Sequence, residues 1–293
     1  MPMRETLEDR IFQYINIVLM LIICFLMLYP IAFVLGRSFM SEAERAVRPL
    51  ALVPRDLSMS AYEFIFARGS YVRSAYFITV SRTVVGSLSS LFFSSLMAYV
   101  LSRREYPIRV PVTFMVVFTM WFQGGLIPNF LLIRALGLTN NFLVYILPGL
   151  ISAWNMLILR NFFMSIPDTL HESARMDGAN DWTIFIRIVL PLSSAALATI
   201  GLFYAVSQWN AWFDAMMFNS RRSLWPMQLF LREIVVNAQA ATFSDASSMS
   251  ERLPPAESVQ MATIVVATVP ILCLYPFLQK YFVKGVMVGS IKG

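Results

Sequence analysis

Six long apolar runs dominate the sequence and constrain most strongly what the chain can fold into. A helix that crosses a bilayer needs about 20 mostly apolar residues, because each residue adds about 1.5 Å across a hydrocarbon core of about 30 Å. Lipid cannot hydrogen-bond the backbone, so a segment inside it must be a helix or part of a closed barrel. We therefore predict an all-α integral membrane protein with six transmembrane helices. The runs cover residues 11–35, 76–101, 110–133, 141–159, 192–218 and 259–282.

The composition agrees with a membrane protein. Hydrophobic residues make up 58% of the 293 residues, charged residues make up 14%, and the mean hydropathy is +0.65. A soluble domain carries fewer apolar and more charged residues. The first run is too long for the apolar region of a signal peptide, so we expect a retained helix. We find no linker between domains, and we expect residues 1–293 to form a single transmembrane domain.

The charges and the cysteines argue against two other classes of protein. The net charge is +6, but the arginines are spread through the polar gaps between the runs and form no block. This distribution favours membrane lipid as a partner and does not favour nucleic acid. Cys24 and Cys273 both lie inside apolar runs, so the sequence predicts no disulfide framework.

The polar gaps predict which parts of the chain share a side of the membrane. Six crossings place both termini on one side, together with the gaps at residues 102–109 and 160–191. The Lys and Arg residues divide equally between the two sides, so their number alone does not orient the chain. The positive-inside rule applies best to short loops, and "SRREYPIR" at residues 102–109 holds three arginines. We therefore expect both termini to be cytoplasmic.

The fourth gap contains an unusually polar stretch, "HESARMDGANDWTIFIRIVLP". Ser165 and Asp168 form an S-x-x-D arrangement, which predicts a helix N-cap, and Gly178 suits the end of that helix. Asp181 can cap a second helix, so residues 165–191 are predicted to form a helix-turn-helix outside the hydrocarbon. This pattern fits either a solvated connector or a docking element for a soluble partner. Apolar residues recur at helical spacing in the second helix at Trp182, Phe185, Ile186 and Val189.

Part of this segment resembles the EAA loop of permease subunits from type I ATP-binding-cassette (ABC) importers. That loop has the pattern E-A-A, three residues, G, nine residues and I-x-L-P. This chain departs from it only at Ser173, where one small residue replaces another. Seven specified positions at fixed gaps make the likeness specific. The matching residues are Glu172, Ser173, Ala174, Gly178, Ile188, Leu190 and Pro191.

The resemblance extends through most of the chain and points to the saccharide-importing branch of these permeases. Within that branch it is strongest for the complex-polysaccharide subgroup, which includes alginate importers. It implies a multi-pass protein of the bacterial plasma (inner) membrane, with a cytoplasmic coupling loop between helices four and five. The stretches that carry it include "GGLIPNFLLIRALGLTNN", "ILPGLISAWNMLILRNFFMSIPD", "LATIGLFYAVSQWNAWFDAM", "WPMQLFLREI" and "VKGVMVGSIKG".

The resemblance gives the polar segment a role in coupling to ATP. The chain contains no G-x-x-x-x-G-K-[ST], so we expect it to be no enzyme and to hold no cofactor. ATP and Mg are expected on two partner ATPase subunits. In the family, the first short helix fits a cleft on the ATPase, where Glu172 makes polar contacts and Gly178 permits a bend. A surface charge paired with Arg175 is the alternative role for Glu172. The expected coupling residues are Glu172, Ser173, Ala174, Arg175, Asp177, Gly178, Ile188, Leu190 and Pro191.

The other expected partners also follow from the resemblance. They are a second permease subunit, an extracytoplasmic solute-binding protein and an oligosaccharide, with an acidic, alginate-like chain among the candidates. Transport would occur by alternating access. The arginine-rich gaps at residues 36–75 and 219–258 would attract an acidic binding protein or an acidic saccharide. Ordinary solvated loops are the alternative for both gaps.

Polar and aromatic residues in the apolar runs are candidates for the substrate path. Proteins bind saccharides by stacking aromatic rings on the sugar and by hydrogen bonds to its hydroxyls. Tryptophans near helix ends can instead form an interfacial belt, and amides can join helices. The candidates are Gln123, Asn129, Trp154, Asn155, Gln208, Trp209, Asn210 and Trp212.

The remaining chemistry candidates are weak. His171 is the only histidine, so it predicts no metal site, and it is either an incidental interface residue or a pH switch. An ion-gradient-driven secondary transporter would need carboxylates or a histidine inside the membrane. The six runs hold only Asp214. A membrane-embedded enzyme or scaffold is disfavoured because no catalytic cluster is present.

Overall fold

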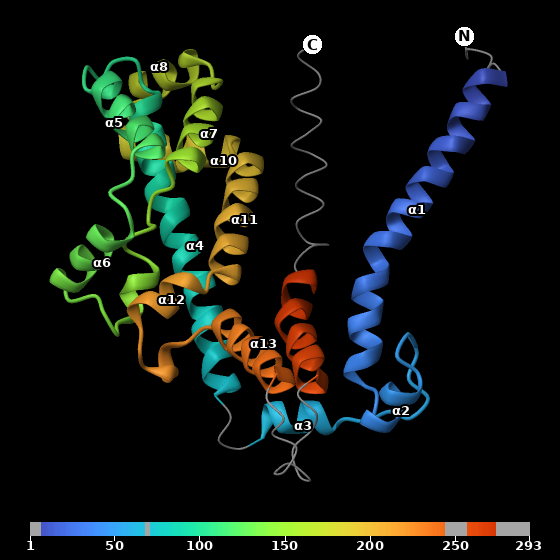
Figure 1. The fold of residues 1–293 in the computed structure, drawn as a ribbon. Coiled ribbons are helices and arrows are strands. Elements are labelled where there is room, and N and C mark those ends of the chain that lie inside the picture. Colours follow the sequence, from blue (N-terminus) through green and yellow to red (C-terminus); the bar gives the residue numbers. More distant parts are fainter. Residues whose placement is uncertain (1–6, 68–70, 244–256, 274–293) are drawn as a thin grey trace. The chain divides into compact units, whose positions relative to one another are not determined.

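The computed structural model describes residues 7–67, 71–243 and 257–273. Its contacts divide the chain into two compact units, which we describe separately. Unit 1 comprises Met1–Ser70 with Glu233–Thr268, and unit 2 comprises Tyr71–Arg232 with Val269–Gly293. The described backbone consists of helices and their connections, with an isolated antiparallel bridge between Met40 and Leu57 (Figure 1). An all-α fold is therefore confirmed for the described residues.

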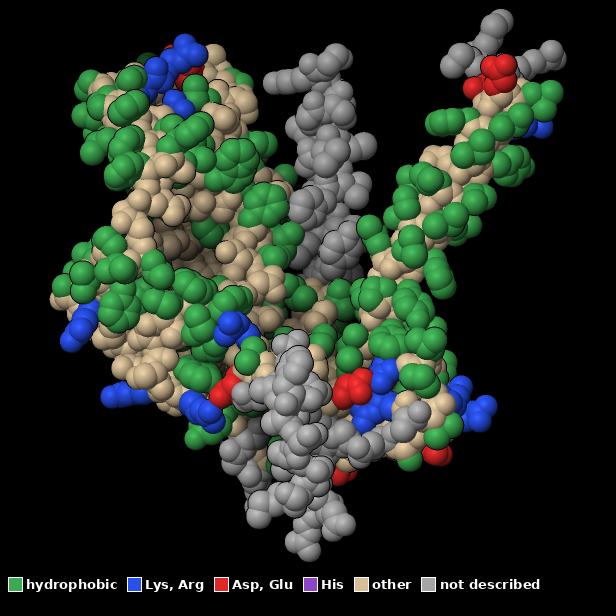
Figure 2. All heavy atoms as spheres, viewed as in Figure 1, with side chains coloured by type: hydrophobic (Ala, Val, Ile, Leu, Met, Phe, Trp, Pro, Cys, Tyr) green, Lys and Arg blue, Asp and Glu red, His purple; other side chains and the backbone are tan. Residues whose placement is uncertain are grey.

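Among the described residues, two helices are each long and apolar enough to cross a membrane. They are α1 (Leu7–Ser38) in unit 1 and α4 (Val72–Ser102) in unit 2. They confirm the helices expected over residues 11–35 and 76–101. Apolar side chains cover α1 along most of its length in Figure 2, as expected for a helix in contact with lipid.

The third apolar run, predicted as a span over residues 110–133, is not one continuous helix. It forms α5 (Arg109–Trp121) and α6 (Leu126–Ala135), which are bent by 118°. The break holds two consecutive glycines, and Gly125 has a φ of +89°, which L-residues with side chains rarely adopt. Hydropathy is summed along the chain and does not report direction, so it could not predict this bend. The two helices together are long and apolar enough for one broken span.

The fourth and fifth runs are interrupted as well. In the fourth, the short 3-10 helix η1 (Phe142–Tyr145) is separated from α7 (Ala153–Met164) by a stretch that contains Pro148 and Gly149. Both residues disfavour a helix interior. In the fifth, α11 (Ser194–Asn210) ends before α12 (Phe213–Phe218). These breaks correct the predicted continuous helices over residues 141–159 and 192–218.

The long gaps also contain helices that the sequence analysis did not predict. Unit 1 has α2 (Glu42–Val47) and α3 (Ser60–Phe66). The second long gap contains the 3-10 helix η3 (Arg222–Leu224) and α13 (Met227–Phe243). The sixth run is described as the apolar helix Glu257–Cys273. The rest of that prediction, residues 274–282, lies outside the described residues.

The core of unit 2 forms where α4 packs against α7 and α11 (Figure 1). Small residues allow this close approach, because a Cβ added at Gly86 would lie 2.9 Å from the side chain of Gln208. Ala98, Met156 and Leu159 are fully buried in the same cluster. The packing leaves polar side chains of three helices facing one another, and these form part of the site described next.

Candidate functional site

Residues 165–191 form two helices joined by a turn at one end of unit 2. The first helix, α8 (Asp168–Met176), ends in a left-handed turn at Gly178, whose φ is +81°. The amide of Gly178 donates to the Arg175 carbonyl at 3.0 Å, and the amide of Ala179 donates to the Ala174 carbonyl at 2.9 Å. This pair of hydrogen bonds is a Schellman motif. The predicted end of the first helix at Gly178 is therefore confirmed.

Both predicted helix caps differ from the structure. The Ser165 hydroxyl donates to the Phe162 carbonyl at 2.7 Å, so it closes the end of α7 and does not begin α8. The second helix is capped by Asn180, whose side-chain oxygen accepts the amide of Thr183 at 2.8 Å. The predicted cap, Asp181, is the first residue of that helix. Its carboxylate is instead bound by neighbouring side chains.

The second helix contains an irregular turn that changes which residues face inward. It runs through α9 (Asp181–Ile184), the π-helix η2 (Phe185–Val189) and α10 (Leu190–Leu192). Ile184, Phe185 and Val189 are buried, whereas Ile186 is 43% exposed and Trp182 is half-exposed. The π-helix holds more residues per turn and shifts the face of the helix. The predicted apolar face is thus correct at Phe185 and Val189 and wrong at Ile186.

The coupling candidates on α8 lie on opposite sides of the helix. Glu172, Ser173 and Asp177 are exposed, whereas Ala174 is buried in the core cluster. No described residue forms a hydrogen bond or ion pair with the Glu172 side chain, so the alternative pairing with Arg175 is not observed. Met176 is 89% exposed, and the sequence analysis missed it. The exposed side of α8 therefore presents acidic and apolar groups together.

Arg175 points back into the chain and not outward with Glu172. It forms ion pairs with Glu105 at 2.7 Å and with Asp181 at 3.1 Å. The Arg175 hydrogen bonds lower the pKa of both carboxyl groups below their usual values. Tyr106 also donates its hydroxyl hydrogen to Asp181 at 2.9 Å, and Arg103 pairs with Glu105 at 2.7 Å. These contacts tie α8 and the turn after it to residues 102–109.

Charged side chains accordingly gather at the end of unit 2 that carries α8 (Figure 2). In the sequence, the arginines of residues 102–109 indicated only the orientation of the chain, and their contacts with α8 were not predicted. Residues 102–109 and α8 lie together, as expected for two gaps on one side of a membrane. Arg103 and Asp168 form a further contact at 3.5 Å.

His171 lies on the inner side of α8. It is 3% exposed, and its ring stacks on Tyr99 with centroids 6.4 Å apart. Burial, and then the charge of Arg103, lower the pKa of His171 below its usual value, so the ring is neutral at pH 7. This environment is that of a packed core histidine.

The last three coupling candidates connect this element to α11. Ile188 and Leu190 are partly buried against the core cluster. Pro191 is exposed at the end of the second helix, next to a bend of 85° between Asp181–Leu192 and Ser194–Asn210. A displacement of α8 would therefore reach α11 through a short, well-packed connection.

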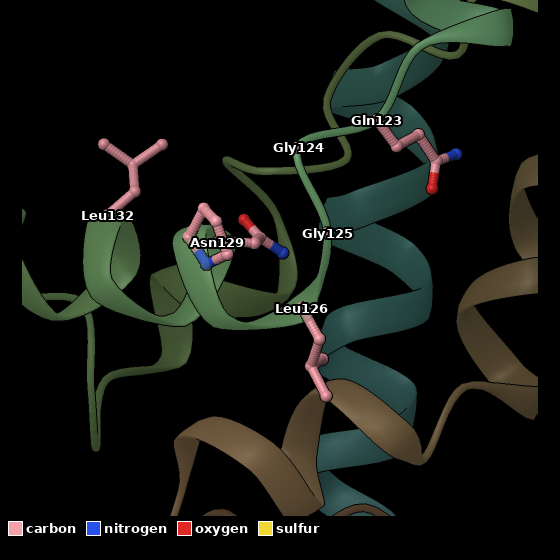
Figure 3. A pocket seen from close by; sticks show the side chains of 7 residues that line it. Gln123, Gly124, Gly125, Leu126, Asn129 and Leu132 are labelled. Atoms are coloured by element: carbon pink, nitrogen blue, oxygen red, sulfur yellow. The ribbon is translucent and has the colours of Figure 1, made fainter.

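A first cavity lies at the break between α5 and α6. It has a volume of about 580 Å³. Gln123 and Asn129 line it from the two sides of Gly124 and Gly125, as Figure 3 shows. Both residues were candidates for the substrate path, and the structure places them around one cavity. Leu126 and Asn129 also line a second cavity, of about 440 Å³.

The second cavity lies among α4, α6, α7, α11 and α12 of unit 2. Asn129, Asn155 and Gln208 come together in its wall, so three of the sequence candidates line one space. The cavity also contains charged and hydroxyl groups that were not proposed as path residues. They are Arg82, Tyr145, Ser152, Tyr204 and Ser207, and they lie beside Asp214, which the stretch "SQWNAWFD" had offered as a path residue.

Four of the path candidates do not line either cavity. Trp154 is 61% exposed, Trp209 is buried and Asn210 is exposed. Trp212 packs in a second core cluster, with the Arg232 guanidinium 4.5 Å from its ring centre. Successive residues of a helix point about 100° apart, so neighbours of Gln208 on α11 face elsewhere. Polar residues that are adjacent in the sequence therefore do not all line the same cavity.

Arg82 is a charged residue that lines the second cavity from α4. It is 1% exposed in the middle of α4 and forms an ion pair with Asp214 at 2.6 Å. Its guanidinium also lies 4.3 Å from the ring centre of Tyr145. An arginine inside an apolar run is a strong functional signal, because burying an unpaired charge is costly. Its partner lies far along the chain and could not be assigned from the sequence.

These features define a class of protein. Apolar spans, polar cavities between helices, a charged element at one end and the absence of a nucleotide-binding motif together describe a membrane permease subunit. The chain belongs to the family of permease subunits of ABC sugar transport systems. It is 43% identical to the polygalacturonan/rhamnogalacturonan transport system permease protein YtcP of Bacillus subtilis (strain 168), over 98% of this chain and 100% of that protein. No protein-family model matches the chain.

Solved structures agree with this assignment. A bacterial ABC transporter involved in the import of the acidic polysaccharide alginate contains a chain with 34% identity and a TM-score of 0.85. The match covers 96% of this chain and 100% of the other. A chain of the bacterial alginate ABC transporter in complex with an alginate pentasaccharide-bound periplasmic protein has 16% identity and a TM-score of 0.59, over 92% and 93% of the two chains. That second likeness shows the shared fold.

Proposed function

We propose that this chain is one permease subunit of an ATP-driven, binding-protein-dependent importer of oligosaccharides. The observation that carries the proposal is the 43% identity to a sugar permease over nearly the whole chain. An ion-gradient-driven transporter has no support among these relatives. The carboxylate it would need, Asp214, is paired with Arg82.

The proposed topology has six spans in a single transmembrane domain, with both termini in the cytoplasm. Four of these spans are two single helices and two bent pairs that are each long and apolar enough together for one broken span. The run at residues 141–159 and the apolar helix Glu257–Cys273 would supply the other two. The ion pairs between residues 102–109 and α8 support a shared cytoplasmic side for these two segments. Three nearby arginines in the short loop favour that side.

The proposed coupling element is the pair of helices at residues 165–191. Its exposed side, with Glu172, Ser173 and Asp177, would contact an ATPase subunit that binds ATP and Mg. Its inner side, with Ala174 and Arg175, would hold α8 to the permease. The Gly178 turn and the connection through Ile188, Leu190 and Pro191 would pass the motion to α11. Two ATPase subunits would serve two permease subunits.

The proposed substrate is an oligosaccharide delivered by an extracytoplasmic solute-binding protein. Names of the relatives include polygalacturonan and alginate, which are acidic polysaccharides, so an acidic oligosaccharide is the first substrate to test. The path would run between this chain and a second permease subunit. Within this chain, the proposed path residues that line cavities are Gln123, Asn129, Asn155 and Gln208.

Transport by the reconstituted importer tests the proposed function. The chain would be purified with its copurifying partners, placed in proteoliposomes and assayed for uptake of trigalacturonate, an alginate trisaccharide and arabinotriose. We expect uptake of at least one probe to require both ATP and the binding protein. Uptake by this chain alone, driven by a proton gradient and indifferent to ATP, would overturn the proposal. If none of the three probes is taken up, the proposed substrate class is contradicted.

A further inference from the structure

The second cavity contains an arginine that has no hydrogen-bonding capacity left for a ligand. A guanidinium group has five N–H donors. Arg82 donates from Nε and Nη2 to Gln208 Oε1, both at 3.2 Å, and from Nη1 to the Ala211 carbonyl at 3.2 Å. It also donates to the two carboxylate oxygens of Asp214, at 3.3 and 2.6 Å. Five donors thus make five hydrogen bonds within the chain.

These contacts fix the groups around Arg82. They close the end of α11 at Ala211 and hold the first turn of α12 through Asp214. Gln208 is held from both ends of its amide, because its nitrogen donates to the Tyr145 carbonyl at 3.2 Å. Arg82 therefore positions the wall of the cavity, and a bound anion would have to displace one of its partners.

Asp214, in contrast, keeps capacity to accept a hydrogen bond. An ionised carboxylate has about four acceptor positions. Two are used by Arg82 and a third by the amide of Ala215, at 2.9 Å. The Asp214 side chain is 28% exposed and lines the cavity. A hydroxyl group in the cavity can therefore donate to a carboxylate that is already fixed in place.

Asn155 offers a second polar group from another helix. It is 9% exposed, lines the cavity from α7, and no described residue forms a hydrogen bond with its side chain. Its amide nitrogen and oxygen are not enclosed by the protein, so they are open to the space of the cavity. A molecule bound there can therefore form hydrogen bonds with this amide, which has two N–H donors and one carbonyl acceptor.

The size and the charge of the cavity restrict that molecule. A volume of about 440 Å³ lies within the range of small-molecule sites and accommodates one or two sugar rings. Tyr145, Phe213 and Phe218 add aromatic surface. The charges of Arg82 and Asp214 cancel, and the acceptor that remains free is negative. A carboxylate would be repelled by that acceptor, whereas a hydroxyl would bind it.

We propose that this cavity is a subsite for the hydroxyl-bearing face of a sugar ring. Asp214 accepts a sugar hydroxyl hydrogen, Asn155 bonds a second hydroxyl, and Arg82 is a positioning residue that holds Asp214. The carboxylates of an acidic saccharide bind elsewhere. This inference rests on the proposed function, because a saccharide must reach the cavity during transport.

Uptake kinetics of the complete importer test the subsite. The probe is whichever of trigalacturonate, the alginate trisaccharide and arabinotriose the wild-type importer takes up fastest. We expect Asp214→Asn and Asn155→Ala each to raise the KM for uptake about tenfold, the loss of one hydrogen bond to a buried group. The matched control is Asn161→Ala, because Asn161 is exposed on the same helix as Asn155 and lines neither cavity.

Arg82→Lys separates positioning from a structural role. Lysine keeps the positive charge but loses the planar fork that holds Asp214 and Gln208. We expect a raised KM with a maximal uptake rate, per assembled importer, close to that of the wild type. A merely structural role would lower the amount of assembled importer and leave the KM of the remainder unchanged.

The outcomes distinguish this inference from the proposed function. Wild-type uptake with unchanged KM values in Asp214→Asn and Asn155→Ala would overturn the subsite and leave the proposed function intact. Faster uptake of an acidic probe by Asp214→Asn would also overturn it, because Asp214 would then repel the substrate. If Asp214→Asn fails to assemble, Asn155→Ala decides alone. No ATP-dependent uptake of any probe by the wild type would instead contradict the proposed function.

Discussion

Two arginines join separate segments of unit 2, one at the charged end and one in the cavity wall. Arg175 has a side chain that is 40% exposed, and its partners Glu105 and Asp181 are 47% and 48% exposed. Arg82 has a side chain that is 1% exposed, and its partner Asp214 is 28% exposed. Both arginines bind two side chains, but only the Arg175 guanidinium is itself exposed to water.

This difference determines what each arginine contributes. An exposed ion pair contributes about 0–1 kcal/mol, because water solvates both charges when it breaks. Removing one partner from a buried pair costs about 3–5 kcal/mol, because the other charge stays buried. The charged end of unit 2 can therefore rearrange at low cost, whereas the cavity wall is held in one arrangement. That contrast suits the proposed coupling element at the charged end and the proposed sugar subsite in the cavity.

Arg82→Met tests the buried ion pair and has the largest expected effect. The change leaves the Asp214 carboxylate without its cation and the Gln208 oxygen without its donor. We expect a loss of about 3–5 kcal/mol of stability. Thermal disassembly of the purified importer in detergent measures this loss as a lower transition temperature.

The double variant Arg82→Met with Asp214→Leu is the control for uncompensated charge. A buried ion pair replaced by apolar residues of similar size often costs little. We therefore expect the double variant to be more stable than Arg82→Met alone. Equal destabilisation in the single and double variants would show that Arg82 acts through packing and not through Asp214.

The same contrast explains which features could be predicted from the sequence. Gly178 ends α8 through contacts within six residues, and its position was predictable. Ser165 also acts locally, but it lies between two helices. The sequence pattern predicted that it begins α8, whereas its hydroxyl closes the end of α7. The partners of Arg82 lie 126 to 132 residues further along the chain. A single sequence contains no signal that joins such distant residues.

Helix direction was the other unpredictable property. The apolar runs at residues 11–35 and 76–101 each form one uninterrupted helix, whereas three other runs are interrupted. The interruptions contain Gly124, Gly125, Pro148 and Gly149, so the break signals were present. Their consequence, a bend of 118° between α5 and α6, depends on which surfaces pack together. The cavities follow from those bends, and so the shared wall of Asn129, Asn155 and Gln208 was not predictable.

Gly178→Pro has the next largest expected effect, at the charged end. Proline cannot adopt a φ of +81° and has no N–H to donate to the Arg175 carbonyl. We expect the importer to assemble but its ATPase activity to lose its dependence on substrate-loaded binding protein, because the turn no longer transmits motion. ATPase assays with and without loaded binding protein measure this dependence.

Gly178→Ala is the matched control for the turn. A Cβ at this position would meet no atom within 4 Å, so alanine adds only the left-handed strain of about 1–2 kcal/mol. We expect this variant to retain binding-protein dependence at lower stability. Normal dependence in Gly178→Pro, or its complete loss in Gly178→Ala, would contradict a role for the turn as a lever.

Arg175→Gln has the smallest expected effect and tests the exposed side of the comparison directly. Arg175 lowers the pKa values of Glu105 and Asp181, so both carboxylates stabilise the folded state when ionised. That stabilisation is complete above their ordinary pKa values of about 4.3 and 3.9, and it is lost as the pH falls through the lowered values. The wild type should therefore be more stable than Arg175→Gln by less than about 1 kcal/mol at pH 7.

The difference in stability between these two proteins should shrink in high salt, and it should disappear once the pH lies below the lowered pKa values, because screening and protonation each remove the ion pairs. Thermal disassembly at several pH values and salt concentrations measures it. Arg187→Gln is the control, because Arg187 is exposed on the same element and forms no ion pair with a described residue. A loss in Arg175→Gln as large as that in Arg82→Met, and insensitive to salt, would mean that exposure does not separate the two arginines. The charged end would then be as rigid as the cavity wall, and its coupling motion would have to arise at Gly178 alone.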